Sequence, residues 1–261
     1  MSDAPPGVIL AIDVGNSNIK LGIHRAGRWE RRFRVSTVRT KTPDEYALTF
    51  RDLLKRIDVS FKDIDTAVMS SVVPPLTAVI AEMLDGEMER KPIVVGPGIR
   101  TGIRIRTDNP VEVGADIVTN AVAAYDRYRS ACIIVAFGTA LTFAAVNESG
   151  DLLGVSIAPG LEPAAEAVVR VSAQLRLVEY AAPPTAIGRN TVHSLQSGIV
   201  FGYVGLVEGL VGRIRAELGG TAQVVSTGDQ ARYLLPLTAS LGEFDPWLTL
   251  DGLALIAARN A

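Results

Sequence analysis

The sequence contains a single cysteine, Cys132, and only two histidines, His24 and His193, in 261 residues. One cysteine cannot form a disulfide within the chain, so a disulfide-stapled fold is excluded. Its position in the apolar run ACIIVAF is typical of a buried, inert thiol. The two histidines lie far apart and have no cysteine or histidine companions, which argues against a metal site built on them.

The sequence also lacks a large excess of positive or negative charge, and it lacks long apolar runs. The net charge is −2, and Lys and Arg are spread along the chain, so nothing favours nucleic-acid binding. We interpret the one basic run, RRFR at 31–34, as a solvated strand face. The N-terminal MSDAPPG does not resemble a signal peptide, and no apolar stretch reaches the roughly 18 residues that suggest a membrane span. We therefore expect a soluble, cytoplasmic protein that binds neither nucleic acid nor membrane.

The 48% hydrophobic composition is enough for one large domain or two domains of roughly 120 residues. Branched apolar or alternating runs predict strands, and 3.6-residue periodicity with Pro, Asp or Gly at the start predicts helices. Predicted strands are 8–13, 19–24, 30–36, 66–73, 92–95, 101–106, three strands within 132–157, and 222–226. Predicted helices are 43–57, 76–86, 114–128, 161–176, 190–218 and 250–260.

The opening pattern of the chain returns in its second half. Both ILAIDVGNSNIKLG at 9–22 and CIIVAFGTALTF at 132–143 read as strand, glycine-centred polar turn and strand. An internal duplication of this kind predicts two similar α/β halves. We place the boundary near residue 115, which gives domains 1–115 and 116–261. The alignment pairs Asp13 with Ala136, Gly15 with Gly138, Asn16 with Thr139 and Ser17 with Ala140.

The first polar turn follows a buried strand that ends near a carboxylate, Asp13. Backbone N–H groups in a tight turn of small residues can hold phosphate oxygens, and a carboxylate can orient a hydrated Mg²⁺ that bridges the phosphates. The alternative is an ordinary β-hairpin with a capping aspartate. The chain contains neither GxxxxGK[ST] nor GxGxxG after a strand, which excludes a P-loop and a Rossmann fingerprint. The predicted phosphate clamp consists of Asp13, Gly15, Asn16, Ser17 and Asn18, with Lys20 either adding charge or facing solvent.

Five glycines fall on one face of the predicted helix 190–218. They are four, three, four and three residues apart, and a glycine inside a helix costs about 1 kcal/mol relative to alanine. We expect close packing against another helix there. The glycines are Gly198, Gly202, Gly205, Gly209 and Gly212.

The duplicated strand–turn–strand resembles the actin, sugar-kinase and Hsp70 superfamily, and within it the chain resembles type III pantothenate kinases. The resemblance spans the whole chain and is carried, in order, by DVGNSNIKLG (13–22), SSVVPP (70–75), NPVEVGAD (109–116), FGTALTF (137–143), PG (159–160), IGRNTVHSLQSGIVFGY (187–203) and STG (226–228). It implies an α/β fold of two duplicated ribonuclease-H-like domains with an interdomain nucleotide cleft. It also implies a homodimer that uses Mg-ATP, with K⁺ or NH₄⁺, to phosphorylate pantothenate in the first step towards coenzyme A.

The resemblance also implies roles for particular residues. Asp116 would be the base that takes the proton from the substrate hydroxyl, while Asp13 would orient Mg²⁺ through water. Residues 13–20 would form the first phosphate loop. Gly138 and Thr139 would contact the nucleotide phosphates. The pantothenate site would include Gly114, Ala115, Asp116, Ile117 and Thr191. A different, structural interpretation of Asp116 is an acidic residue favoured by the positive end of a helix dipole.

Several departures from the family pattern fall on functional positions, among them Ala144 in place of a second expected carboxylate. Ile117 stands where the family motif GADR has an arginine, and Ala136 stands where DFGT has the aspartate implied to hold the monovalent cation. Three hypotheses follow: a working pantothenate kinase, a catalytically impaired paralogue that acts by binding or regulation, and a kinase for another small hydroxyl compound. The retained Asp116 favours the first and third, while Ile117 favours the second and third.

Overall fold

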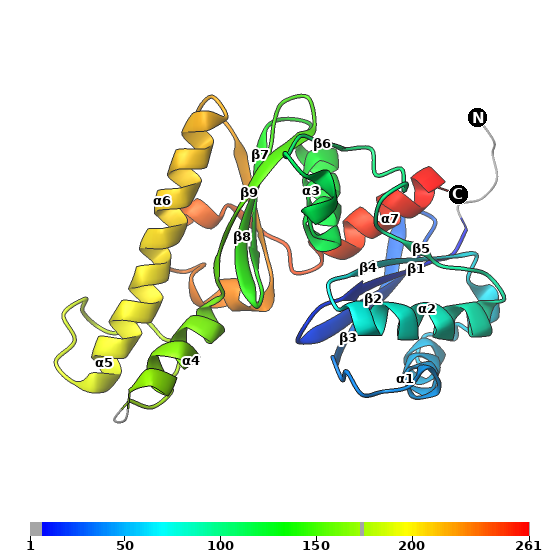
Figure 1. Ribbon diagram of the computed structural model, residues 1–261, viewed down its shortest axis with the longest axis horizontal. Coiled ribbons are helices and arrows are strands. Elements are labelled where there is room, and N and C mark those ends of the chain that lie inside the picture. Colours follow the sequence, from blue (N-terminus) through cyan, green and yellow to red (C-terminus); the bar gives the residue numbers. More distant parts are fainter. Residues whose placement is uncertain (1–6, 173–174, 261) are drawn as a thin grey trace. The chain divides into compact units, whose positions relative to one another are not determined.

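The structure is a computed structural model that describes residues 7–172 and 175–260. The stretch MSDAPPG spans residues 1–7, of which 1–6 lie outside the described residues, as do residues 173–174 of the predicted helix 161–176. The chain divides into two compact units (Figure 1). Unit 1 contains the chain up to residue 104 together with 108–123 and 248 onward, and unit 2 contains 105–107 and 124–247.

This division differs from a single boundary after residue 115. The helix α3 (Ala115–Tyr128) begins in unit 1 and ends in unit 2. The last helix, α7 (Leu248–Asn260), returns to unit 1, where it packs on β1 and β4. Eight of its residues, from Leu248 to Ala257, are buried, so the helix completes the core of the first unit.

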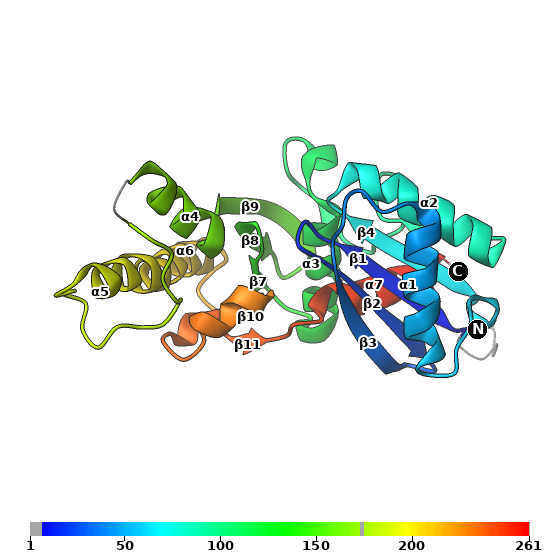
Figure 2. The same ribbon diagram turned by 90° about the horizontal axis from the view of Figure 1, so that it is seen from below.

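Unit 1 is built on a five-stranded sheet in the order β3-β2-β1-β4-β5. Its elements are β1 (Ile9–Val14), β2 (Asn18–Arg25), β3 (Arg28–Ser36), α1 (Pro43–Lys55), η1 (Phe61–Asp63), β4 (Thr66–Ser71), α2 (Pro74–Met88), β5 (Ile93–Val94) and η2 (Pro110–Glu112). β1 pairs antiparallel with β2 and parallel with β4. The helices α1 and α2 lie on one face of this sheet and α7 on the other (Figures 1 and 2).

Local signals set the ends of the unit 1 helices. Thr42 and Glu45 form a capping box at the start of α1, and Pro43 occupies its first position. α2 begins at Pro74, two residues before the predicted start, because proline fits the first helical turn, where no N–H donor is needed. Buried side chains such as Ile12, Leu21 and Phe50 form the core between α1, α2 and the sheet.

Unit 2 repeats this topology. Its elements are β7 (Cys132–Phe137), β8 (Ala140–Val146), β9 (Asp151–Pro159), α4 (Leu161–Val171), α5 (Thr191–Gln196), η3 (Ser197–Phe201), α6 (Gly202–Glu217), β10 (Gln223–Thr227), η4 (Asp229–Tyr233), η5 (Ala239–Leu241) and β11 (Glu243–Phe244). The sheet order is β11-β10-β7-β8-β9-β6, where β6 spans Arg104–Ile105. Without β6 and read in reverse, this order is β9-β8-β7-β10-β11, which corresponds strand by strand to β3-β2-β1-β4-β5 of unit 1. The predicted duplication is therefore confirmed.

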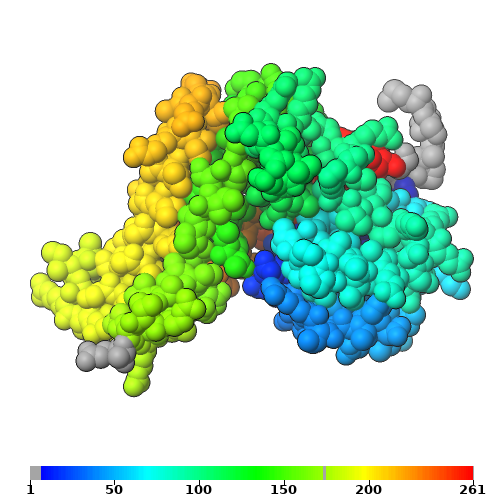
Figure 3. Space-filling model, viewed as in Figure 1, coloured from blue at the N-terminus to red at the C-terminus, as the bar shows by residue number. Residues whose placement is uncertain are grey.

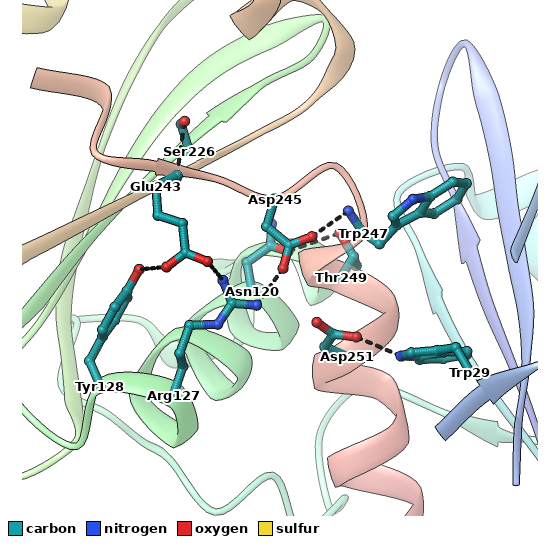
Figure 4. A network of polar contacts seen from close by, with 10 residues as sticks. All are labelled: Trp29, Asn120, Arg127, Tyr128, Ser226, Glu243, Asp245, Trp247, Thr249 and Asp251. Atoms are coloured by element: carbon teal, nitrogen blue, oxygen red, sulfur yellow. Dashed lines mark hydrogen bonds and ion pairs between the residues drawn. The ribbon is translucent and has the colours of Figure 1, made fainter. Parts of the chain in front are cut away.

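The short strand β11 carries no clear sequence signal and was not predicted. It is held by side chains of α3, because Arg127 contacts both Glu243 and Asp245, and the Tyr128 hydroxyl donates to Glu243 Oε2 at 2.9 Å (Figure 4). The cysteine of β7 is buried as predicted. Burial raises the pKa of the Cys132 thiol to about 12, so the thiol stays protonated and inert.

The helical segment Thr191–Glu217 corrects the expectation that no stretch is apolar enough to suggest a membrane span. α5, η3 and α6 form one helix of 27 residues, with a mean hydropathy of 1.4 over an 18-residue window that is 22% buried. Length and composition alone would let it cross a membrane, which is weak evidence for a span. The π-helical turn η3 allows α5 and α6 to join without a break.

Candidate active site

Asp13 lies one residue before the end of β1. Its register partners are Lys20 on β2 and Ser70 on β4. Burial raises the pKa of Asp13 to about 7, the charge of Lys20 lowers it, and the charge of Asp116 raises it. Ionising this carboxyl group costs free energy when no positive charge is close enough to offset burial. A bound cation with its water shell would lower that cost, so the site suits a cation.

Asp116 stands in the first turn of α3, and Gly114 makes room for it. A Cβ atom on residue 114 would lie 2.6 Å from Asp116 Oδ1, so a side chain there would displace the carboxylate. Burial raises the pKa of Asp116, whereas the backbone N–H groups of Ile117 and Asp116 lower it by hydrogen bonding to the carboxylate. The net upward shift brings this carboxylate closer to the pKa that suits a general base near neutral pH.

The fold brings the two predicted carboxylates into the same unit. Asp13 and Asp116 both belong to unit 1, and they are close enough for the charge of one to raise the pKa of the other. Sequence reasoning had placed them in different domains. They meet because the first nine residues of α3 fold with the N-terminal sheet.

The first turn joins β1 to β2 through Gly15, Asn16 and Ser17. Asn16 and Ser17 are exposed, and the Gly15 N–H donates to the carbonyl of Asn18 at 3.0 Å, which closes the turn. The exposure of Asn16 and Ser17 is compatible with the predicted phosphate site, which stays a prediction.

Two residues that the sequence analysis missed hold this turn from outside. The Thr37 hydroxyl donates to the Gly15 carbonyl at 2.6 Å, and the Thr37 N–H donates to the Ser17 carbonyl at 3.0 Å. Arg39 Nη2 donates to Asn16 Oδ1 at 2.9 Å. The stretch STVRT directly after β3 was the available signal, because a hydroxyl and a guanidinium there can reach back to the hairpin.

The second turn, in unit 2, is one residue shorter. β8 already begins at Ala140, so only Gly138 and Thr139 separate the strands, and Ala140 is not a turn residue like Ser17. Both turn residues are exposed. The Gly160 N–H donates to the Thr139 carbonyl at 3.0 Å, and a Cβ on Gly160 would overlap the carbonyl oxygen of Gly138.

Ala136 occupies the place in β7 that Asp13 occupies in β1. Each is one residue before the end of its strand, and each has a buried hydroxyl as its parallel neighbour: Ser70 beside Asp13 and Thr227 beside Ala136. Among the described residues, neither hydroxyl has a hydrogen-bond partner, although both side chains are buried. The second hairpin therefore keeps the strand pairing of the first, with a shorter turn and without a carboxylate at this position.

Comparison with known sequences decides the family. A sequence model of the type III pantothenate kinases matches residues 9–213. The chain belongs to the type III pantothenate kinase family. The type III pantothenate kinase of Citrifermentans bemidjiense is 47% identical over 253 residues, which cover 97% of this chain and 100% of that one. That of Moorella thermoacetica is 46% identical with the same coverage of both chains.

Solved structures confirm the fold of this family member. A Baf-family protein from Campylobacter jejuni superposes with a TM-score of 0.61 at 18% identity, covering 96% of this chain and 98% of that one. Component A of the (R)-2-hydroxyglutaryl-CoA dehydratase from Acidaminococcus fermentans gives 0.57 at 14% identity, covering 97% and 98%. Together with the two sheets of equal topology, these likenesses confirm the predicted actin, sugar-kinase and Hsp70 type of fold.

The residues expected at the family's pantothenate site fall in both units. Gly114, Ala115 and Ile117 surround Asp116 at the start of α3 in unit 1. Thr191 is the exposed first residue of α5 in unit 2, next to the N-cap Asn190, whose side chain accepts from the His193 N–H at 2.9 Å. Both positions lie at the start of a helix, and at each of them side-chain oxygens already accept hydrogen bonds from first-turn N–H groups: the Asp116 carboxylate from Asp116 and Ile117, and Asn190 from His193.

The donor set at Asp13 fits a hydrated magnesium ion rather than a protein-caged metal. Within residues 7–172 and 175–260, no group of three or more His, Cys, Asp or Glu side chains could hold a metal. Mg²⁺ commonly keeps several waters and takes one or two carboxylates together with phosphate oxygens. Asp13 can supply one carboxylate. At Ala136 the methyl group offers no ligand, so the monovalent-cation position implied by the family does not fit this chain.

Proposed function

We propose that the protein is a pantothenate kinase that transfers the γ-phosphoryl group of ATP to pantothenate, which gives 4'-phosphopantothenate for coenzyme A biosynthesis. The observation that carries the proposal is the pairing of Asp13 and Asp116 in one unit, each with a raised pKa. Membership of the type III pantothenate kinase family supports the choice of pantothenate as the acceptor.

Bound Mg-ATP supplies the phosphoryl group and a metal charge on its phosphate oxygens. Asp13 would hold the hydrated metal, with Gly15, Asn16, Ser17 and Asn18 around the phosphates. Lys20, directly across from Asp13 in the sheet, would balance negative charge there. In unit 2, Gly138 and Thr139 would provide the second phosphate contact.

Asp116 would accept the proton of the primary hydroxyl of pantothenate. As that proton moves to the carboxylate, the hydroxyl oxygen bonds to the γ-phosphorus and the bond to the ADP oxygen breaks. A general base of this kind contributes typically about 10²–10⁴-fold to the rate. Gly114 keeps the carboxylate in place, because any side chain at that position would overlap it.

We also propose that the protein acts as a cytoplasmic homodimer that needs neither nucleic acid nor membrane. A Cβ built on any of the five helix glycines, from Gly198 to Gly212, would have no atom within 4 Å apart from its chain neighbours and the nearby backbone of its own helix. The described chain therefore does not supply the helix that was predicted to pack against these glycines. Nearby apolar side chains are also exposed, including Val171 at 83% and Ile187 at 80%. Figure 3 shows α4 and α5 at the surface of unit 2. A second copy on this face would cover both features.

A second candidate function is a non-catalytic paralogue that acts by binding. Ala136 and Ile117 favour it, because they remove a carboxylate and a bidentate donor from positions where the family has them. Kinase activity on another small hydroxyl compound is the third possibility. Ile117 makes the surroundings of Asp116 more apolar, which suits a less anionic acceptor.

One assay separates these functions. Purified protein is incubated with Mg-ATP and pantothenate, with K⁺, with NH₄⁺ and with neither, and the phosphorylated product is measured by mass spectrometry. We expect product from the wild type and almost none from Asp116→Asn. Equal, background-level product from both, in a folded protein, would contradict the proposal. Product from another hydroxyl compound but not from pantothenate would support the third function.

A further inference from the structure

The C-terminal helix α7 contains no residue assigned to phosphate or substrate, yet it contacts both elements that carry the carboxylates. It packs on β1, the strand of Asp13, and its residues also contact α3, the helix of Asp116. Three contacts hold α7 to its neighbours in unit 1.

One of these contacts is a buried side-chain hydrogen bond. The Thr249 hydroxyl donates to Asn120 Oδ1 at 2.9 Å, and both side chains are buried (Figure 4). Asn120 lies one helical turn after Asp116. A buried polar pair of this kind fixes the register of two elements, because sliding either one leaves a polar atom without a partner.

A second contact brings the two backbones together. A Cβ on Gly252 would overlap the backbone oxygen of Thr119, so only glycine permits the observed approach of α7 to α3. The Thr119 hydroxyl donates to the Ala115 carbonyl at 2.6 Å, which ties this point of contact to the residue before Asp116.

A third contact holds the other side of α7. The Trp29 indole N–H on β3 donates to Asp251 Oδ1 at 2.7 Å (Figure 4). Thr249, Asp251 and Gly252 therefore bind α7 to both α3 and the sheet within a single helical turn. α7 cannot slide without breaking one of these contacts.

We propose that α7 is a positioning element, in which Thr249 and Gly252 fix α3, through Asn120 and Thr119, so that Asp116 stays in place beside Asp13. The inference rests on the proposed role of Asp116 as the base. It assigns a function in catalysis to residues that touch neither substrate nor nucleotide. A misplacement of about 1 Å at a catalytic group can cost roughly 10²-fold in rate.

The test compares Thr249→Val with Thr249→Ser in the full-length protein. Valine keeps the shape of threonine and removes the donor, whereas serine keeps the donor. We expect kcat to fall about tenfold or more in Thr249→Val, with the KM for ATP within twofold of wild type, and kcat to stay near wild type in Thr249→Ser.

Gly252→Ala should give a larger loss of kcat than Thr249→Val. Gly86→Ala is its matched control, since Gly86 is a helical glycine of the same unit whose Cβ would meet nothing within 4 Å. The control should keep the wild-type kcat. Wild-type kcat in both Thr249→Val and Gly252→Ala would overturn the proposal.

Hydrogen–deuterium exchange provides a readout that does not depend on activity. In Thr249→Val we expect faster exchange confined to the first two turns of α3, with the sheet of unit 1 unchanged and with wild-type exchange in Thr249→Ser. Unchanged exchange in α3, or acceleration spread over the whole unit, would contradict positioning even if the wild type phosphorylated nothing. Failure of the wild type to transfer phosphate, with exchange as expected, would overturn the proposed function and leave the positioning of α3 supported.

Discussion

The β1–β2 hairpin of unit 1 and the β7–β8 hairpin of unit 2 have the same topology and different chemistry. Both strands β1 and β7 are central in their sheets, and both pair antiparallel with one neighbour and parallel with the other. Asp13 in the first hairpin corresponds to Ala136 in the second. The comparison shows that the fold does not require a carboxylate at this position.

The difference also indicates why a carboxylate is kept at only one of the two places. A buried carboxyl group destabilises the folded state when it ionises, which is the reason that the pKa of Asp13 is raised to about 7. A residue that opposes folding at neutral pH is retained when it has another use. Ala136 has no ionisable group and therefore no such cost. The second turn can contribute only backbone groups and the Thr139 hydroxyl.

The largest expected effect is that of replacing Asp116, the proposed base. Replacing Asp116 by Asn should lower kcat by about 10²–10⁴-fold, because the amide cannot accept the substrate proton. Steady-state kinetics with ATP and pantothenate measure this. A circular-dichroism melt is the control for folding, and a loss of less than threefold would remove Asp116 from the base role.

Asp13→Asn should change the free energy of unfolding in a pH-dependent way. The pKa of Asp13 is raised from 3.8 to about 7, so the folded protein binds this proton more tightly than the unfolded chain does. Its stability contribution is therefore present below pH 3.8 and is lost as pH rises through about 7. The variant cannot ionise and should be more stable than wild type at pH 8, by up to roughly 4 kcal/mol at about 1.4 kcal/mol per pKa unit.

Urea unfolding at several pH values, in the presence of a metal chelator, measures this difference. The advantage of Asp13→Asn should grow between pH 4 and pH 7 and then level off. A constant difference across that range would mean that the carboxyl group of Asp13 does not titrate as the structure indicates.

Ala136→Asp makes the second hairpin like the first. The new carboxylate enters the half-buried end of β7, next to the buried Thr227. We expect a loss of roughly 1–3 kcal/mol at pH 8 without potassium, because an unpaired charge loses its hydration there. Potassium should reverse part of the loss in this variant and have little effect on wild type. Equal potassium responses in both proteins would show that the cation does not bind at position 136.

Ile117→Arg tests the second departure from the family pattern. A guanidinium at the start of α3 would attract an anionic acceptor, so the KM for pantothenate should fall by about tenfold, equivalent to roughly 1.4 kcal/mol. The KM for ATP is the internal control and should change little. A higher KM for pantothenate would indicate that the natural acceptor prefers the apolar side chain.

Thr227→Val should have the smallest effect of all. The Thr227 hydroxyl is buried and has no partner among the described residues, so its removal should change stability by less than about 1 kcal/mol in either direction. Ser70→Ala is the matched change in unit 1. A clear loss of ATP affinity in Thr227→Val, measured by calorimetry, would instead make that hydroxyl a ligand for the nucleotide.

The sequence predicts the duplication well, because hydrophobic periodicity and the two glycine turns are local signals. It predicts the position of β1 to within a residue and places three strands within 132–157, and it pairs Asp13 with Ala136. It does not predict that α7 returns to unit 1, since a helix amphipathic enough to cover one sheet could equally cover the other. Thr37 and Arg39 were missed because their contacts with the first turn depend on the pairing of β3 with β2, which the local pattern of STVRT does not reveal by itself.

We propose that only the first of the two corresponding hairpins supplies a metal-orienting carboxylate, and that this carboxylate supports phosphate transfer. Asp13→Ala tests it most directly, because it gives the first hairpin the side chain of the second. We would measure the rate of 4'-phosphopantothenate formation by wild type and by this variant over a range of Mg²⁺ concentrations. We expect turnover in wild type and at least a hundredfold loss in Asp13→Ala, with the fold intact. Equal rates in the two proteins would contradict it.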